Sequence, residues 1–219
     1  GVLKYISIRH GGANIGEGNE INGLTLGGVG SGTTIENIEI VANDDDGIEW
    51  FGGTVNVKNV VVWNVGDDAI DTDQSWGGTL DNFIVINPGD ECLELDGPEG
   101  TMVAKHTIKN GTVYAGNAQG LVDLDDANIP SDSYVDIDSV YFFGLKVGQD
   151  FDSVPTYYPC TFSNLEATLP AGTTLEQFFK DGSSAFTTAV NAGENTVGAD
   201  ASVFAGWSWT AVSGSLNGF

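Results

Sequence analysis

Two short patterns of alternating apolar and polar residues recur along the first two thirds of the chain. The first pattern reads acidic or Gly, small, apolar, acidic, apolar, acidic, and it occurs at 46–51, 68–73, 91–96 and 120–125. Its starting positions are 22, 23 and 29 residues apart. This alternation predicts β-strands whose apolar side chains point to one face and whose acidic side chains point to the other.

A second pattern keeps in step with the first one. It consists of strand-forming segments that begin at Asn37, Asn59, Asn82 and Asn110 and, with Asp in place of Asn, at Asp138. Two columns of strands that stay in phase while the loops between them vary predict a solenoid, in which each coil buries its apolar face by stacking on its neighbours. Stacked Asn side chains at a turn hydrogen-bond along the ladder and tolerate a left-handed backbone.

We therefore expect an all-β fold, a right-handed parallel β-helix with three-strand coils of about 22–28 residues. The coils occupy residues 1–169, and residues 170–219 form a capping segment of the same domain. The segment Thr173 to Lys180 predicts a short helix. The aromatic stretch 203–212 is expected to cover the open end of the solenoid.

The charge of the chain changes which partners are plausible. Thirty-one acidic residues against seven basic ones give a formal net charge of −24, which repels phosphate backbones and argues against nucleic-acid binding. No apolar run approaches the roughly 20 residues that cross a bilayer, so the chain is not expected to span a membrane. Such a charge needs counterions and predicts an extracellular or cell-surface location. The two cysteines, Cys92 and Cys160, leave a disulfide and two free thiols equally open.

Acidic side chains of the first pattern form a row on the outer face of the predicted solenoid. Stacked coils lie about 4.8 Å apart, so each carboxylate faces a like charge on the next coil. One interpretation is a solvated acidic face, and the other is Ca²⁺ held between the rungs by carboxylate oxygens. Trp50 and Trp76 are the candidates for stacking on a glycan. The candidate metal ligands are Glu49, Asp71, Asp73, Glu94, Asp96, Asp123 and Asp125.

Two acidic turns occur one coil apart, Asn-Asp-Asp-Asp at 43–46 and Gly-Asp-Asp at 66–68. They resemble the turns of polygalacturonases, which belong to the pectin-lyase-like superfamily of parallel β-helices. The chain departs from the family at 89–91, where Gly-Asp-Glu replaces Gly-His-Gly, and it lacks the later Arg-x-Lys motif. The resemblance implies an inverting hydrolase in which carboxyl groups protonate the leaving oxygen and activate water. The residues it implies are Asp46, Asp67, Asp68 and Asp71.

A second resemblance covers nearly the whole chain. Residues 21–35 and 49–56 are similar to exported β-helix proteins of marine and Bacteroidetes-type bacteria. The resemblance implies a lipoprotein or a protein sorted to the cell surface, with a preceding segment that builds the first coils. A preceding β-helix segment or a second chain is therefore expected to dock on the first coil.

The preferred function from the sequence is non-catalytic: an exported β-helix whose acidic face binds Ca²⁺ and attaches to a surface, a matrix, a polysaccharide or another surface protein. The first alternative is a polysaccharide hydrolase or lyase that also uses Asp90 or Glu91. The second alternative is a structural spacer or adhesin stalk, for which neutralising Asp71 and Asp73 leaves ligand binding unchanged.

Overall fold

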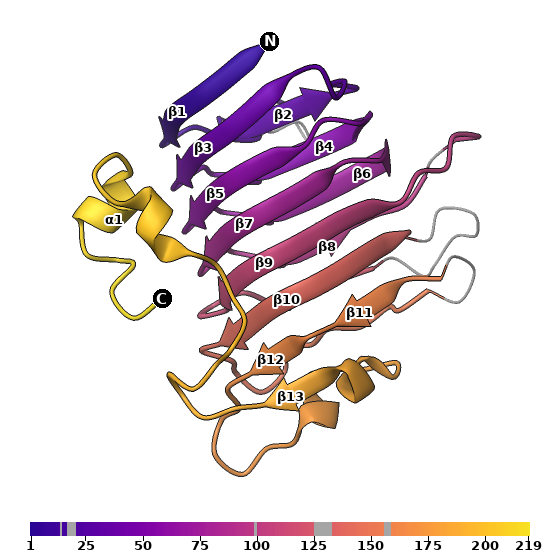
Figure 1. The fold of residues 1–219 in the computed structure, drawn as a ribbon, viewed down its shortest axis with the longest axis vertical. Coiled ribbons are helices and arrows are strands. Elements are labelled where there is room, and N and C mark those ends of the chain that lie inside the picture. Colours follow the sequence, from indigo (N-terminus) through magenta and orange to yellow (C-terminus); the bar gives the residue numbers. More distant parts are fainter. Residues whose placement is uncertain (14, 17–20, 99, 125–132, 156–158) are drawn as a thin grey trace.

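The computed structural model describes residues 1–13, 15–16, 21–98, 100–124, 133–155 and 159–219, and it forms a right-handed parallel β-helix made of two sheets (Figure 1). The long-strand sheet contains, in spatial order, β1 (Val2–Arg9), β3 (Thr34–Val41), β5 (Val57–Trp63), β7 (Thr79–Ile86), β9 (His106–Tyr114), β10 (Val135–Phe143), β12 (Leu165–Ala167) and β13 (Thr187–Ala189), and β11 (Thr161–Ser163) also pairs with β10. The acidic sheet contains β2 (Leu24–Gly27), β4 (Ile48–Gly53), β6 (Ile70–Trp76) and β8 (Leu93–Leu95). The predicted fold class is confirmed.

Most strands of the long-strand sheet bend at one residue with a left-handed backbone. Asn37, Asn59 and Asn82 have φ values of 61°, 57° and 63°. Pairing continues on both sides of the bend, and only the left-handed position itself is skipped in the register between neighbouring strands. Three strands were predicted for each coil. Two of them form one bent strand of the long-strand sheet, because a single left-handed residue turns the chain without ending its hydrogen bonding.

Asparagine side chains at these bends form the expected ladder. Asn59 Nδ2 donates to Asn37 Oδ1, and Asn82 Nδ2 donates to Asn59 Oδ1, both at 2.9 Å. The predicted column is wrong by one residue in β10, where Ser139 rather than Asp138 takes the left-handed position with φ 59°. An Asn side chain suits these positions because its short amide bonds locally and lowers the cost of positive φ.

Apolar side chains of both sheets meet inside the coils. Ile48, Ile70 and Leu93 are fully buried and stack in register along the acidic sheet, as the alternation predicted. Burying each aliphatic side chain of this size contributes about 1.5–3 kcal/mol. Cys92 and Cys160 are both free thiols. Within the described ranges, no helix is long and apolar enough to cross a membrane.

The segment 170–219 divides into two parts with different roles. Its first part contains two 3₁₀ helices, η1 (Leu175–Gln177) and η2 (Ser183–Phe186), and it buries Phe178 and Phe179 against the last coil. The predicted short helix is therefore present as a single 3₁₀ turn. The Gln177 side chain accepts a hydrogen bond from the Thr174 N–H at 2.8 Å, as in a capping box.

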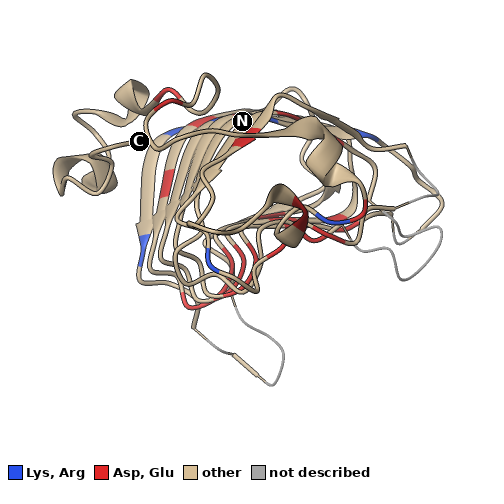
Figure 2. Cartoon of the chain, turned by 90° about the horizontal axis from the view of Figure 1, so that it is seen from below, with Lys and Arg blue, Asp and Glu red and all other residues tan. Residues whose placement is uncertain are grey.

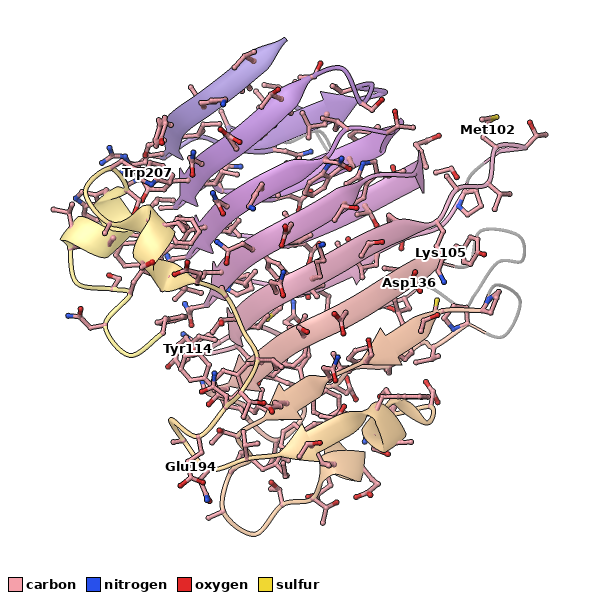
Figure 3. All side chains as sticks on the ribbon, viewed as in Figure 1. Met102, Lys105, Tyr114, Asp136, Glu194 and Trp207 are labelled. Atoms are coloured by element: carbon pink, nitrogen blue, oxygen red, sulfur yellow. The ribbon has the colours of Figure 1, made fainter. Side chains whose placement is uncertain are left out.

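The second part, residues 195–219, which we call the tail, does not cover the end of the solenoid as predicted. It turns back along the long-strand sheet, where η3 (Ala201–Phe204) and α1 (Trp209–Val212) lie beside the N-terminal coils (Figures 1 and 3). The reason is a second apolar cluster on that sheet. Phe204 of the tail is buried there against Val61, Ile84 and Ile86.

Hydrogen bonds fasten the tail near both of its ends. Glu39 is fully buried and accepts from the Thr210 N–H and hydroxyl, each at 2.7 Å, and also from Ser7. Glu166 accepts from the Thr196 N–H and hydroxyl, each at 2.6 Å. The tail thus connects the last coil to the first coils. At each end, the N–H and hydroxyl of a Thr in the tail donate to a Glu of the long-strand sheet.

Candidate metal centre

Four acidic residues of the acidic sheet stack in one row, which we call the carboxylate ladder. Glu49 pairs with Asp71 between β4 and β6, and Asp71 pairs with Glu94 between β6 and β8. An isolated bridge continues the row from Glu94 to Asp123. In Figure 2, acidic positions accordingly recur side by side on neighbouring coils. The predicted column therefore lies on one face.

Burial differs along this row, and it is greater than a solvated face would give. Glu49 and Asp71 are only 7% and 8% exposed. Their neighbours on the same face are half-buried, namely Asp73, Glu94, Asp96 and Asp123. Asp125 lies outside the described residues. A solvent-exposed acidic face is therefore not what the structure shows at Glu49 and Asp71. The Asn22 amide also donates a hydrogen bond to the Glu49 carboxylate.

A second row of carboxylates lies at the corner that precedes each strand of the acidic sheet. Asp46 Oδ1 accepts from the Asp68 N–H at 3.1 Å, and Asp68 Oδ1 accepts from the Glu91 N–H at 2.6 Å. These bonds join one coil to the next at the turn and give the buried corner acids a structural role. Asp67 and Asp90 beside them are half-buried.

The two rows converge at three buried residues. One carboxylate oxygen each from Asp46, Glu49 and Asp71 lies within 4.8 Å of the other two. Asp46 also belongs to a second group, with Asp45 and Asp67, at the same separation. The sequence placed Asp46 only among the catalytic alternatives, because the residue opens the repeated pattern but precedes the strand whose outward acidic side chains define the ladder. The structure brings it to Glu49 and Asp71 through the turn before β4.

This donor set fits a hard divalent cation. Ca²⁺ binds oxygen at 2.3–2.6 Å, so two oxygens on opposite sides of one ion lie about 4.6–5.2 Å apart. The oxygens of Asp46, Glu49 and Asp71 fall within that limit. Lysine and arginine are spread elsewhere, and the ion pairs found in the described part of the chain join Lys4 to Glu36, Lys58 to Asp81, and Lys105 to Asp136. Figure 3 shows the last pair at the loop end of the long strands.

Electrostatics at the convergence point favour either protons or a bound cation. Burial, together with repulsion from neighbouring carboxylates, raises the pKa of Asp46 to about 7 and that of Glu49 to about 8. Burial, with repulsion from Asp46, Glu49 and Glu94, raises the pKa of Asp71 to about 11. Low dielectric and like charges both disfavour the ionised form. A positive ion placed among these oxygens would offset the repulsion between them and favour the ionised form of each carboxyl.

The predicted glycan-stacking residues do not reach the surface. Trp50 and Trp76 are 0% and 1% exposed, and their rings stack on each other with centroids 4.6 Å apart. Trp76 also contacts the ring of His106 inside the core. The prediction for these tryptophans is wrong, because both point to the apolar side of the strands, where they fill the interior of the coil.

The residues of the hydrolase interpretation lie close together but differ in access. Asp67 is half-buried and open to a ligand, whereas Asp46, Asp68 and Asp71 are each less than a tenth exposed. Burial raises the pKa of Asp68 to about 10, with a hydrogen bond to Glu94 as the next cause. Asp68 would therefore hold a proton at neutral pH.

Comparison with known proteins gives one positive result. The model of a family described as pectate-lyase like beta helix domain matches residues 1–210. No curated protein and no solved structure matches the chain. The matched range includes both rows of carboxylates and most of the tail.

Proposed function

The chain belongs to the pectate-lyase-like β-helix family, and we propose that it is a non-catalytic, exported domain whose acidic sheet binds calcium and mediates attachment to a surface, a matrix or a polysaccharide. The observation that carries the proposal is the convergence of Asp46, Glu49 and Asp71, whose oxygens lie within 4.8 Å of one another. Burying several like charges is costly unless protons or a cation neutralise them. A Ca²⁺ ion supplies that neutralisation and accepts several oxygen ligands at once.

An extracellular location fits the same site. Calcium-binding modules outside cells work with dissociation constants of about 0.1–1 mM. The net charge of −24 also favours an environment rich in cations. Docking of a further coil or a second chain on the first coil stays a prediction, which the 69% exposure of Val2 and the 63% exposure of Tyr5 on β1 support.

Titration calorimetry with CaCl₂ tests the proposal. We expect saturable binding by the unmodified chain and at least tenfold weaker binding by Asp46→Asn and by Asp71→Asn. Glu194→Gln is the matched control, since Glu194 is an exposed acidic residue that lies beside the tail and far from the acidic sheet (Figure 3). Equal affinities for all variants would contradict the proposed site.

A polysaccharide hydrolase is the second candidate function. The observation that favours it is the pairing of a half-buried carboxylate, Asp67, with a neighbour, Asp68, whose raised pKa lets it keep a proton. Release of reducing ends from polygalacturonate or neutral polysaccharides, abolished in Asp67→Asn, would support this candidate. No release by the unmodified chain, together with calcium binding, would leave the non-catalytic function.

A structural spacer is the remaining alternative. It predicts that the double variant Asp71→Asn/Asp73→Asn keeps both the fold and the binding of any ligand. Loss of calcium binding in this variant with an unchanged circular dichroism spectrum would therefore argue against a spacer.

A further inference from the structure

A walled groove runs along the outer surface of the long-strand sheet, opposite to the interior of the coils and away from the acidic sheet. The tail forms its wall, and the sheet holds that wall through side chains of three different coils. The Thr196 N–H donates to Glu166, the Ala199 N–H donates to Thr112 Oγ1 at 2.8 Å, and the Asp200 N–H donates to Asn82 Oδ1 at 2.6 Å. The wall is thus fixed in place before any ligand arrives.

The asparagine ladder is interrupted under this wall. Among the described residues, the run of Asn-to-Asn bonds along the strand bends ends at Asn82, whose amide oxygen accepts from the tail at Asp200. Asn110 on the next coil donates instead to Asp81 Oδ1 at 2.7 Å. On the coil after that, the rung is the shorter Ser139, whose hydroxyl donates to Asp138. Two rungs of the ladder therefore lack the amide contact that the earlier coils make.

Two hollows flank this interruption. Their volumes are about 350 and 380 Å³, and they share Asn110 and Gly198. The first is lined by Ser139 and by residues 195–199 of the tail, and the second extends past Lys58 and Asp81. Amides and hydroxyls both donate and accept hydrogen bonds. Lys58 and Asp81 of the sheet oppose each other at 3.8 Å, and Asp200 of the tail adds a second carboxylate to the lining of the second hollow.

We propose that this groove binds a stretch of uncharged polysaccharide, laid along the solenoid axis over the interrupted rungs. Sugar hydroxyls donate and accept hydrogen bonds, as an amide side chain at position 139 would. Coils repeat every 4.8 Å or so, which is close to the advance of one sugar residue in an extended glycan. An anionic polysaccharide is disfavoured because the molecule carries a net charge of −24 and Lys58 is the one basic side chain, of those that the structure describes, that lines the two hollows. The site is separate from the acidic sheet and needs no cation.

Calorimetric titration with four neutral hexasaccharides, those of cellulose, xylan, mannan and laminarin, tests the proposal. All titrations are made in EDTA, so a failure here leaves the calcium proposal unaffected. We expect at least one probe to bind the unmodified chain. Ser139→Asn should weaken that binding at least tenfold, because the longer Asn side chain would occupy the space beside Ser139 that the sugar needs. The variant should still fold, because Asn is better suited than Ser to a backbone with φ 59°.

Two lysine variants give an independent check. Lys58→Ala removes a side chain that is 57% exposed at the groove, and we expect about fivefold weaker binding, the worth of one hydrogen bond of about 1 kcal/mol. Lys4→Ala is the matched control, since Lys4 also pairs with a carboxylate on the same sheet but lies outside the groove. Melting curves verify that each variant is folded. Binding of none of the probes, binding unchanged in Ser139→Asn, or binding that requires calcium would overturn the proposal.

Discussion

Replacing Asp71 by Asn separates the cation interpretation from a purely structural one. Two ionised carboxylates 4.8 Å apart repel by about 3.5 kcal/mol at an effective dielectric constant of about 20. Asp71 has Asp46 and Glu49 within that distance, so full ionisation without a cation would be strongly unfavourable. The raised pKa of Asp71, about 11, accordingly keeps it protonated at pH 7 in EDTA. Asn resembles the protonated acid in shape, and we expect the unfolding free energy in EDTA to change by less than about 1 kcal/mol.

Calcium should distinguish the two proteins. If the site binds with a dissociation constant of about 0.1 mM, calcium at about 10 mM stabilises the unmodified chain by about 2.7 kcal/mol. For a domain of this size, each kcal/mol raises the melting temperature by about 2–4 °C, so the expected rise is about 5–11 °C. Asp71→Asn lacks one of three anionic ligands and should lose most of this rise.

Circular dichroism melting curves in EDTA and in CaCl₂ provide the assay. Glu194→Gln should show the full calcium-dependent rise, since its carboxylate is exposed and remote from the ladder. An equal rise for Asp71→Asn and the unmodified chain would refute the assignment of this residue as a ligand. No rise in the unmodified chain would refute calcium stabilisation altogether.

Three further predictions follow from the electrostatics and the ladder. In EDTA, stability should fall as the pH rises from about 5 to about 8, because burial raises the pKa of Glu49 to about 8 and the folded state keeps a proton that the unfolded state has already lost; urea unfolding that is flat over this range would contradict the raised pKa. Glu39→Gln should lower the unfolding free energy in urea by about 1–3 kcal/mol at pH 7 and by little near pH 3. Hydrogen bonds from Ser7 and Thr210 outweigh the effect of burial and lower the pKa of the Glu39 carboxyl, so its contribution to stability is lost as the pH falls. An equal cost at both pH values would contradict this account. Asn59→Ala should be less stable than Asn59→Gly by about 1 kcal/mol, since only Gly adopts positive φ without strain; equal stability would show that the left-handed bend is unimportant.

Much of the fold was predictable because it depends on periodicity. The apolar and acidic alternation placed Ile48 and Leu93 inside and Glu49 and Asp71 on the opposite side of the strands, and the register confirms that stacking. The recurrence of Asn predicted the ladder because a left-handed residue must return once per coil. These features follow from local geometry repeated along the chain.

Features that depend on contacts between distant segments were not predictable. The burial of Glu49 and Asp71 requires the fold around the ladder, and Asp46 reaches them from the turn that precedes β4. The path of the tail follows from Phe204 meeting Val61 and its neighbours, about 140 residues earlier in the chain. The predicted glycan contact of Trp50 is wrong because this residue lies on the inner face of its strand, where a large aromatic side chain fills the core.

Anomalous X-ray diffraction from crystals grown in CaCl₂ tests the calcium site most directly. The proposal predicts a calcium peak bonded at 2.3–2.6 Å to oxygens of Asp46, Glu49 and Asp71. Density that shows these three carboxyl groups hydrogen-bonded to one another, with no anomalous peak between them at saturating calcium, would contradict it.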